Sequence, residues 1–184
     1  MIIEEKNMDI NRKNKYGENC LLLACGENSN LEIIKYLIGD KKMDVNYVSG
    51  YRKYNFLLSC KENCLLLACK KNPNLEITKY LIEEIKMDIN YKNKEGENCL
   101  LLACKKNPNL EIIKYLIKEK RMNINCKNKD GENCLQLACK MNPNLKIIKY
   151  LIEEIRMDIN YKNEGEENCL LLACGENSNL EIIK

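Results

Sequence analysis

The chain has 184 residues, of which 45% are hydrophobic and 31% are charged, and its formal net charge is +3. This balance is typical of a globular protein and excludes an intrinsically disordered chain. The longest apolar run, Cys20 to Cys25, is far shorter than the roughly 18 residues that a membrane span needs, and the N-terminal segment with Glu4 and Glu5 is unlike a signal peptide. We therefore expect an intracellular, cytoplasmic protein.

The sequence is built from an internal repeat. The tripeptide Asn-Cys-Leu recurs with its cysteine at positions 64, 99, 134 and 169, a period of 35 residues, and once more at position 20. A fixed period of about 20 to 50 residues is typical of solenoids and propellers. We divide the chain into the end of a preceding unit, residues 1–8, and five units: residues 9–43, 44–87, 88–122, 123–157 and 158–184, the last one truncated.

Unit 3 shows the elements expected in every unit, beginning with a turn and a short helix. Residues 87–96 are polar, rich in turn-forming residues and closed by Gly96, so this segment predicts a projecting turn, which we call the finger. Asn98 follows as an N-cap, because its side chain can accept a hydrogen bond from a free backbone N–H. The helix formers of Cys99 to Cys104 then predict the first helix.

A second helix is expected in the rest of the unit. Asn107 and Pro108 predict an N-cap followed by proline at the first helical position, where the missing N–H does no harm. Leu110, Ile113, Leu116 and Ile117 form a broad apolar stripe at helical spacing. Two such short helices cannot bury this much apolar surface between themselves, so each unit must stack on its neighbours.

The cysteines are expected to be buried, reduced and structural. Ten of the twelve form five pairs: Cys20/Cys25, Cys64/Cys69, Cys99/Cys104, Cys134/Cys139 and Cys169/Cys174. On a helix, five positions put the two thiols roughly 140° apart, so the members of a pair cannot share a metal ion or a disulfide. Cys60 and Cys64 could face one ion if that stretch were helical, but no histidine or further ligand accompanies them. We expect no metal and no cofactor.

The pattern of unit 3 matches a known family in order and spacing. Asp88-Ile89-Asn90, Gly96, Leu100, Leu102-Ala103 and Leu110 to Ile117 follow the motif D-V-N, G, L, L-A and L-E-I-V-K-L-L-L. The unit resembles an ankyrin repeat, and the match recurs along essentially the whole chain. The resemblance implies an all-α, ankyrin-type helix-turn-helix solenoid with projecting finger turns.

Two features depart from the family pattern. The T-P-L-H stretch of the family is Asn98-Cys99-Leu100-Leu101 here, so the threonine and histidine hydrogen bonds are absent. The period is 35 residues, whereas about 33 is usual. The repeats are similar to those abundant in giant DNA viruses and some protists, which would place the protein in a host cytoplasm.

An enzyme is not expected. The chain has no histidine to act as a general base, and it lacks a G-x-S-x-G motif and a glycine-rich phosphate loop. A cysteine nucleophile needs a base and an orienting group, and no thiol has them nearby in the sequence. Adjacent carboxylates such as Glu83 and Glu84 are expected to form a solvated face, because neighbouring helical residues do not face each other.

The family resemblance places a partner-binding surface on the fingers and first helices. The matching positions are Lys92, Lys94, Glu95, Lys105 and Lys106 in unit 3, and Lys127 and Lys129 in unit 4. A groove rich in lysine would favour an acidic protein segment, and nucleic acid is the alternative partner. The same lysines are also explained if they only keep the surface soluble.

Unit 2 has a longer finger, with 20 residues from Asp44 to Cys64 where unit 3 has 11 from Asp88 to Cys99. This insertion carries aromatic and cationic side chains: Tyr51, Arg52, Lys53, Tyr54 and Phe56. Tyrosine and arginine are enriched at interface hot spots, although a loop also lengthens at little entropic cost. The leading hypothesis is a protein-binding scaffold; the alternatives are a nucleic-acid binder and a repeat fragment without a selected partner.

Overall fold

The computed structural model describes residues 9–50 and 61–183, which fold into a row of helix pairs and contain no strand. The first helices are α2 (Cys20–Glu27), α4 (Cys64–Lys71), α6 (Cys99–Lys106), α8 (Cys134–Met141) and α10 (Cys169–Glu176). The second helices are α3 (Leu31–Gly39), α5 (Leu75–Glu83), α7 (Leu110–Lys114), α9 (Leu145–Lys149) and the 3-10 turn η3 (Leu180–Ile182). Helices α7 and α9 continue as π-helical turns, η1 (Tyr115–Glu119) and η2 (Tyr150–Glu154).

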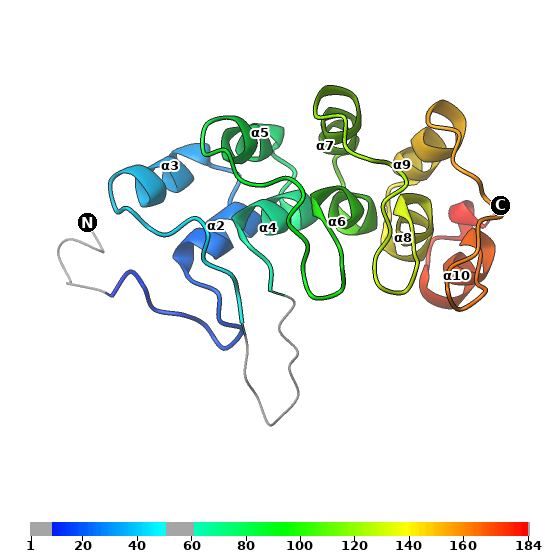
Figure 1. Ribbon diagram of the computed structural model, residues 1–184, viewed down its shortest axis with the longest axis horizontal. Helices are drawn as coiled ribbons and strands as arrows, with labels where there is room; N and C mark the ends of the chain where they lie inside the picture. The colour runs from blue at the N-terminus through cyan, green and yellow to red at the C-terminus, as the bar shows by residue number, and fades with distance from the viewer. Residues whose placement is uncertain (1–8, 51–60, 184) are drawn as a thin grey trace.

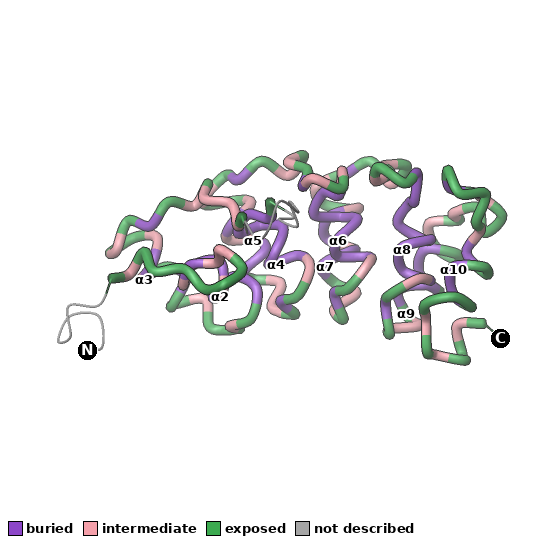
Figure 2. The backbone as a smooth tube through the Cα atoms, turned by 90° about the horizontal axis from the view of Figure 1, so that it is seen from below, coloured by how far each residue is buried: buried purple, intermediate pink, exposed green. Residues whose placement is uncertain are grey.

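The all-α solenoid expected from the sequence is confirmed. The first helices stack side by side in chain order along the row, while α3, α5, α7 and α9 form a second layer above them and the fingers project below (Figure 1). The core follows the stack of first helices, which Figure 2 shows as the buried part of the backbone. No helix in the described part of the chain is long and apolar enough to cross a membrane.

The first helices begin where the sequence predicts. Asn98 caps α6, because its side chain accepts a hydrogen bond from the backbone N–H of Leu101 at 3.0 Å. Asn19, Asn63, Asn133 and Asn168 cap the other first helices in the same way. A helix of eight residues is marginal in isolation, so these helices depend on packing against the neighbouring units.

The predicted start of the second helix is wrong. Asn109, rather than Asn107, is the N-cap of α7, and its side chain accepts from the N–H of Glu111 at 2.9 Å. Asn107 ends α6 instead, with its backbone N–H bonded to the carbonyl of Ala103. The N-cap bond of Asn109 sets this start: unit 1 has Ser29 in place of proline, and its second helix still begins directly after Asn30, whose side chain accepts from the N–H of Glu32.

The side chain of Asn107 forms hydrogen bonds that connect unit 3 to unit 2. Its amide nitrogen donates to the carbonyls of Cys69 at 2.8 Å and Asn72 at 2.9 Å, and the residue is completely buried. The same bonds join the other units: Asn72 to Cys25 and Asn28, Asn142 to Cys104 and Asn107, and Asn177 to Cys139 and Asn142. We call this series the asparagine ladder.

A second, outer row of asparagines runs parallel to the ladder. The N-cap amides of the second helices donate to the preceding unit: Asn74 to Ser29, Asn109 to Pro73, Asn144 to Pro108, and Asn179 to Pro143. Each unit therefore holds its predecessor at two points.

Most of the paired cysteines are buried as expected, with two exceptions. Cys20 is partly exposed and Cys174 is exposed. Cys174 is the second cysteine of its pair. In units 1 to 4 the second cysteine is covered by the first cysteine of the next unit, and in unit 5 no described residue covers it. The thiols that meet belong to consecutive units: Cys25 and Cys64, Cys69 and Cys99, Cys104 and Cys134, Cys139 and Cys169.

Candidate partner-binding surface

The fingers of units 1, 3, 4 and 5 are each folded around one asparagine. In unit 3, Asn93 Oδ1 accepts from the backbone N–H groups of Glu95 at 3.0 Å and Glu97 at 2.9 Å, and its Nδ2 donates to Glu97 Oε2 at 2.9 Å. Gly96 has a positive φ of 78°, which glycine adopts without strain. Asn14 and Asn128 make the same set of bonds in their own fingers, and Asn163 makes the two bonds to Glu167. The finger tips are thus rigidly formed by local bonds.

Consecutive fingers also contact each other through their backbones. Lys129 N–H donates to the carbonyl of Glu95 at 2.8 Å, and Glu164 N–H donates to that of Asp130 at 3.1 Å. A Cβ atom at Gly96 would lie 3.3 Å from the backbone nitrogen of Lys129, so glycine allows this close approach. The fingers of units 3, 4 and 5 therefore form one continuous row.

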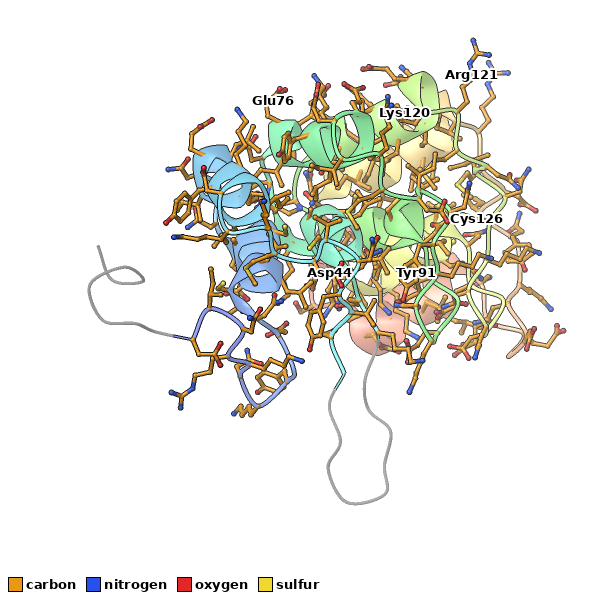
Figure 3. All side chains as sticks on the ribbon, turned by 60° about the vertical axis from the view of Figure 1, so that its left-hand side comes forward. Asp44, Glu76, Tyr91, Lys120, Arg121 and Cys126 are labelled. Atoms are coloured by element: carbon orange, nitrogen blue, oxygen red, sulfur yellow. The ribbon has the colours of Figure 1, made fainter. Side chains whose placement is uncertain are left out.

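A tyrosine hydroxyl bridges most pairs of neighbouring fingers. Tyr47 donates to the Gly17 carbonyl at 2.6 Å, Tyr91 to Lys61 at 3.0 Å, and Tyr161 to Gly131 at 2.9 Å. We call these the bridging tyrosines. Unit 4 has Cys126 at this position, and Figure 3 labels it together with Tyr91 of the preceding finger.

Lysines of one finger lie over the bridging tyrosine of the next. The Nζ atom of Lys13 is 4.4 Å from the ring centroid of Tyr47, and that of Lys127 is 4.3 Å from the centroid of Tyr161. Both distances fit a cation–π interaction. Lys127 therefore has a role within the protein in addition to the binding role expected from the sequence.

The structure separates the predicted site residues by exposure. Lys92, Glu95, Lys106, Lys127 and Lys129 are exposed, and Lys94 is half-buried. The residues predicted on the long finger lie outside the described part of the chain: Tyr51, Arg52, Lys53, Tyr54 and Phe56. Cys60, considered as a metal ligand together with Cys64, also lies outside it.

Lys105 is not a free cation. Its Nζ lies 2.6 Å from Glu97 Oε1, and the exposed fractions of the two side chains are 22% and 5%. The same pair occurs as Lys70–Glu62 at 2.7 Å and as Lys140–Glu132 at 2.9 Å. The spacing of eight residues between glutamate and lysine recurs in units 2, 3 and 4, and this regularity in the sequence would have revealed the pair.

The positive charge of the finger row therefore comes from Lys92, Lys106, Lys127 and Lys129, interleaved with the carboxylates of residues such as Glu95. A pocket of about 340 Å³ lies at the base of the last two fingers, between Lys127, Tyr161, Arg156 and Asp158. It offers both cations and a carboxylate to a partner side chain. Within the described ranges, no three His, Cys, Asp or Glu residues are grouped closely enough to hold a metal ion.

Comparison with known proteins agrees with this architecture. A family model of three ankyrin repeats matches residues 48–127, 65–163 and 106–184, and a model of a single ankyrin repeat matches residues 16–49. No curated protein matches the sequence.

Solved structures show the same fold. One similar chain comes from the complex of a predatory endopeptidase from Bdellovibrio bacteriovorus with an immunity protein. The match has a TM-score of 0.65 and 21% identity, and covers 99% of this chain and 86% of that chain. Since the family models together span nearly all of the sequence, this protein is a member of the ankyrin-repeat family.

Proposed function

We propose that this protein is a non-catalytic scaffold that binds another protein through its finger tips and the exposed ends of its first helices. Ankyrin repeats generally mediate protein–protein interaction. The similar chain from Bdellovibrio bacteriovorus also comes from a complex of two proteins.

The observation that carries the proposal is the row of exposed lysines on rigid fingers. Lys92 and Lys127 occupy the same position in consecutive units, and Lys129 lies in the same finger as Lys127, where its backbone N–H is bonded to Glu95 of the preceding finger. A partner with carboxylates at a matching spacing would gain charge-assisted contacts without ordering the fingers first. Acidic residues such as Glu95 and Asp130 lie among these lysines. An acidic protein segment can place its carboxylates opposite the lysines and neutral side chains opposite these acids, whereas a phosphate backbone carries negative charge along its whole length, so the protein segment is the better partner.

The test compares two double charge reversals in a capture experiment from cell lysate. Lys92→Glu with Lys129→Glu alters the finger row, and Lys146→Glu with Lys149→Glu places the same charge on exposed positions of the second-helix layer. We expect a partner identified with the wild-type protein to be lost with the finger variant and kept with the second-helix variant. Equal retention by both variants would move the binding surface away from the fingers.

A mobility-shift assay with DNA and RNA tests the alternative partner, nucleic acid. Phosphate binding is strongest at low salt, so the absence of a shift at low ionic strength excludes nucleic acid. A shift that the finger variant abolishes would replace the proposed protein partner by a nucleic acid.

A further inference from the structure

The junction between the fingers of units 3 and 4 differs from the other finger junctions. The bridging tyrosines Tyr47, Tyr91 and Tyr161 each donate to a carbonyl that lies 30 residues earlier in the chain. The corresponding residue in unit 4 is Cys126, and the corresponding carbonyl belongs to Gly96. Cysteine is much shorter than tyrosine, so the space that a ring fills elsewhere is not filled by Cys126.

The fingers do not close up to compensate for the smaller side chain. The backbone bond from Lys129 to Glu95 is 2.8 Å long, and the equivalent bond from Glu164 to Asp130, beside the bridging Tyr161, is 3.1 Å long. The same backbone bond therefore joins the finger tips at both junctions. Between the fingers of units 3 and 4, the position that corresponds to the Tyr161 ring is bordered by Lys92, Gly96 and Cys126, and we call this position the slot.

The slot opens to solvent. Tyr47, Tyr91 and Tyr161 are only half-buried where they fill the equivalent space, and Cys126 is half-buried as well. A side chain that occupies this position would therefore lie at the surface of the described part of the chain and not in its core.

The two groups that contact a bridging tyrosine at the other junctions, a backbone carbonyl and a lysine ammonium, are also present at the slot. Within residues 9–50 and 61–183, no side chain donates a hydrogen bond to the Gly96 carbonyl. Lys92 has the position that Lys13 and Lys127 have over their tyrosine rings, and its charge lies close enough to Cys126 to act on the thiol. The acceptor for a hydroxyl and the cation for a ring are both present.

We propose that this slot binds a tyrosine side chain of the partner protein, which takes the place of the missing bridging tyrosine. Its hydroxyl donates to the Gly96 carbonyl, and its ring lies below the Lys92 ammonium. This inference rests on the proposed scaffold function and adds one specific contact to it.

The chemistry of the slot selects tyrosine over related side chains. Phenylalanine has no donor for the Gly96 carbonyl, and a phosphorylated tyrosine presents only acceptor oxygens and charge to it in its fully ionised form. A lysine or arginine would meet the like charge of Lys92. Tyrosine alone among these supplies a hydroxyl donor and a ring for the cation.

The probe for the test is N-acetyl-tyrosine amide. It is titrated into the isotope-labelled protein, and binding is measured from the changes in the backbone amide chemical shifts of the protein. We expect saturable shifts at Lys92, Gly96 and Cys126, and about tenfold weaker binding of N-acetyl-phenylalanine amide, because one hydrogen bond is lost. Cys126→Tyr fills the slot from within and should abolish the shifts. Cys126→Ser keeps the slot open and should preserve them.

A gain-of-site variant keeps the test independent of how Cys126→Tyr folds. Tyr161→Cys reproduces the unit 4 arrangement at the next junction, so a second set of shifts is expected at Gly131 and Lys127. The proposal is overturned if the wild-type chain shows no saturable shifts around Gly96, or if the phenylalanine probe binds as well as the tyrosine probe. Such a result would leave the scaffold function intact, since the lysate capture tests that function through Lys92 and Lys129 with the natural partner.

Discussion

The amide nitrogen of Asn107 lies 2.8 Å from the carbonyl oxygen of Cys69, and this bond crosses from one repeat to the one before it. The carbonyl belongs to the last turn of α4, where no further helical N–H is available to it. A single buried side chain thus completes the helix end of its neighbour. The neighbour's helix and the stacking of the units are stabilised by the same contact.

Asn107→Ala is expected to destabilise the fold by about 2–4 kcal/mol, because it leaves the buried carbonyls of Cys69 and Asn72 without their donor. The matched control is Asn28→Ala. Asn28 has the same place in unit 1, but the bond that its side chain makes within the described residues is a local one from Asn30. Urea unfolding of both variants measures the difference, and equal losses would show that the cross-repeat bonds contribute nothing.

Glu166→Gly is expected to stabilise the fifth unit by about 1 kcal/mol. Glu166 has a positive φ of 60°, a conformation that costs a residue with a Cβ atom about 1–2 kcal/mol. Units 1, 3 and 4 have glycine at this position, whereas in unit 5 the glycine has moved to Gly165. Hydrogen exchange of the α10 amides would detect the gain, and Gly96→Ala should give the opposite effect in unit 3.

The stability of the protein is expected to fall at alkaline pH. Contact with a neighbouring thiol, together with burial, raises the pKa of Cys25 and of Cys99. The folded chain thus keeps protons that the unfolded chain releases near pH 8.5, so this contribution is complete below that pH and is lost as the pH rises towards the folded pKa. We expect a loss of roughly 1–2 kcal/mol per buried thiol by pH 10.

Urea unfolding at pH 7 and pH 10 measures this loss. The double variant Cys69→Ala with Cys99→Ala should lose less stability between the two pH values than the wild type, since lysine and tyrosine titration is common to both. If both chains lose the same amount, the buried thiols are not responsible.

Thiol labelling should separate the cysteines by position. Cys174 is exposed and should react quickly with an aromatic disulfide reagent, whereas its buried counterparts Cys69 and Cys104 should react only after unfolding. Cys126 is half-buried, and contact with Cys134 raises its pKa, so it should react slowly. Mass spectrometry of the digested protein assigns each site, and Cys174→Ser should remove the fast phase. Fast labelling of Cys104 in the native chain would contradict the buried core.

The sequence predicts those features that depend on neighbouring positions in the chain. The caps such as Asn98, the apolar stripe of α7 and the finger closed at Gly96 are all local, and each is found in the structure. The role of Asn107 was missed because its hydrogen-bond partners lie in another unit. The sequence places an asparagine here in every unit, and the local role of N-cap predicted for it was wrong, because Asn109 caps α7 instead.

Burial depends on neighbours and cannot be taken from the local sequence. Residues 18–35 and 167–184 are identical, yet the exposed fractions of Leu21 and Leu22 are 0% and 1%, while those of Leu170 and Leu171 are 55% and 58%. The first two leucines are covered by α4, and no described helix covers the second two. The candidate site has the same limitation in part: the recurring eight-residue spacing indicates a Glu97–Lys105 pair, but the exposed fractions of the two side chains, 5% and 22%, come only from the structure.

The asparagine ladder gives the described repeat interfaces the same hydrogen bonds, whatever the fingers carry. Each rung needs only an amide in one unit and two carbonyls in the unit before it, and carbonyls are present whatever the side chains are. Recombination that inserts or deletes one whole 35-residue unit therefore joins two compatible surfaces without a compensating mutation. The length of such an array can change in single genetic steps, so the reach of its finger row can evolve independently of the stability of its core.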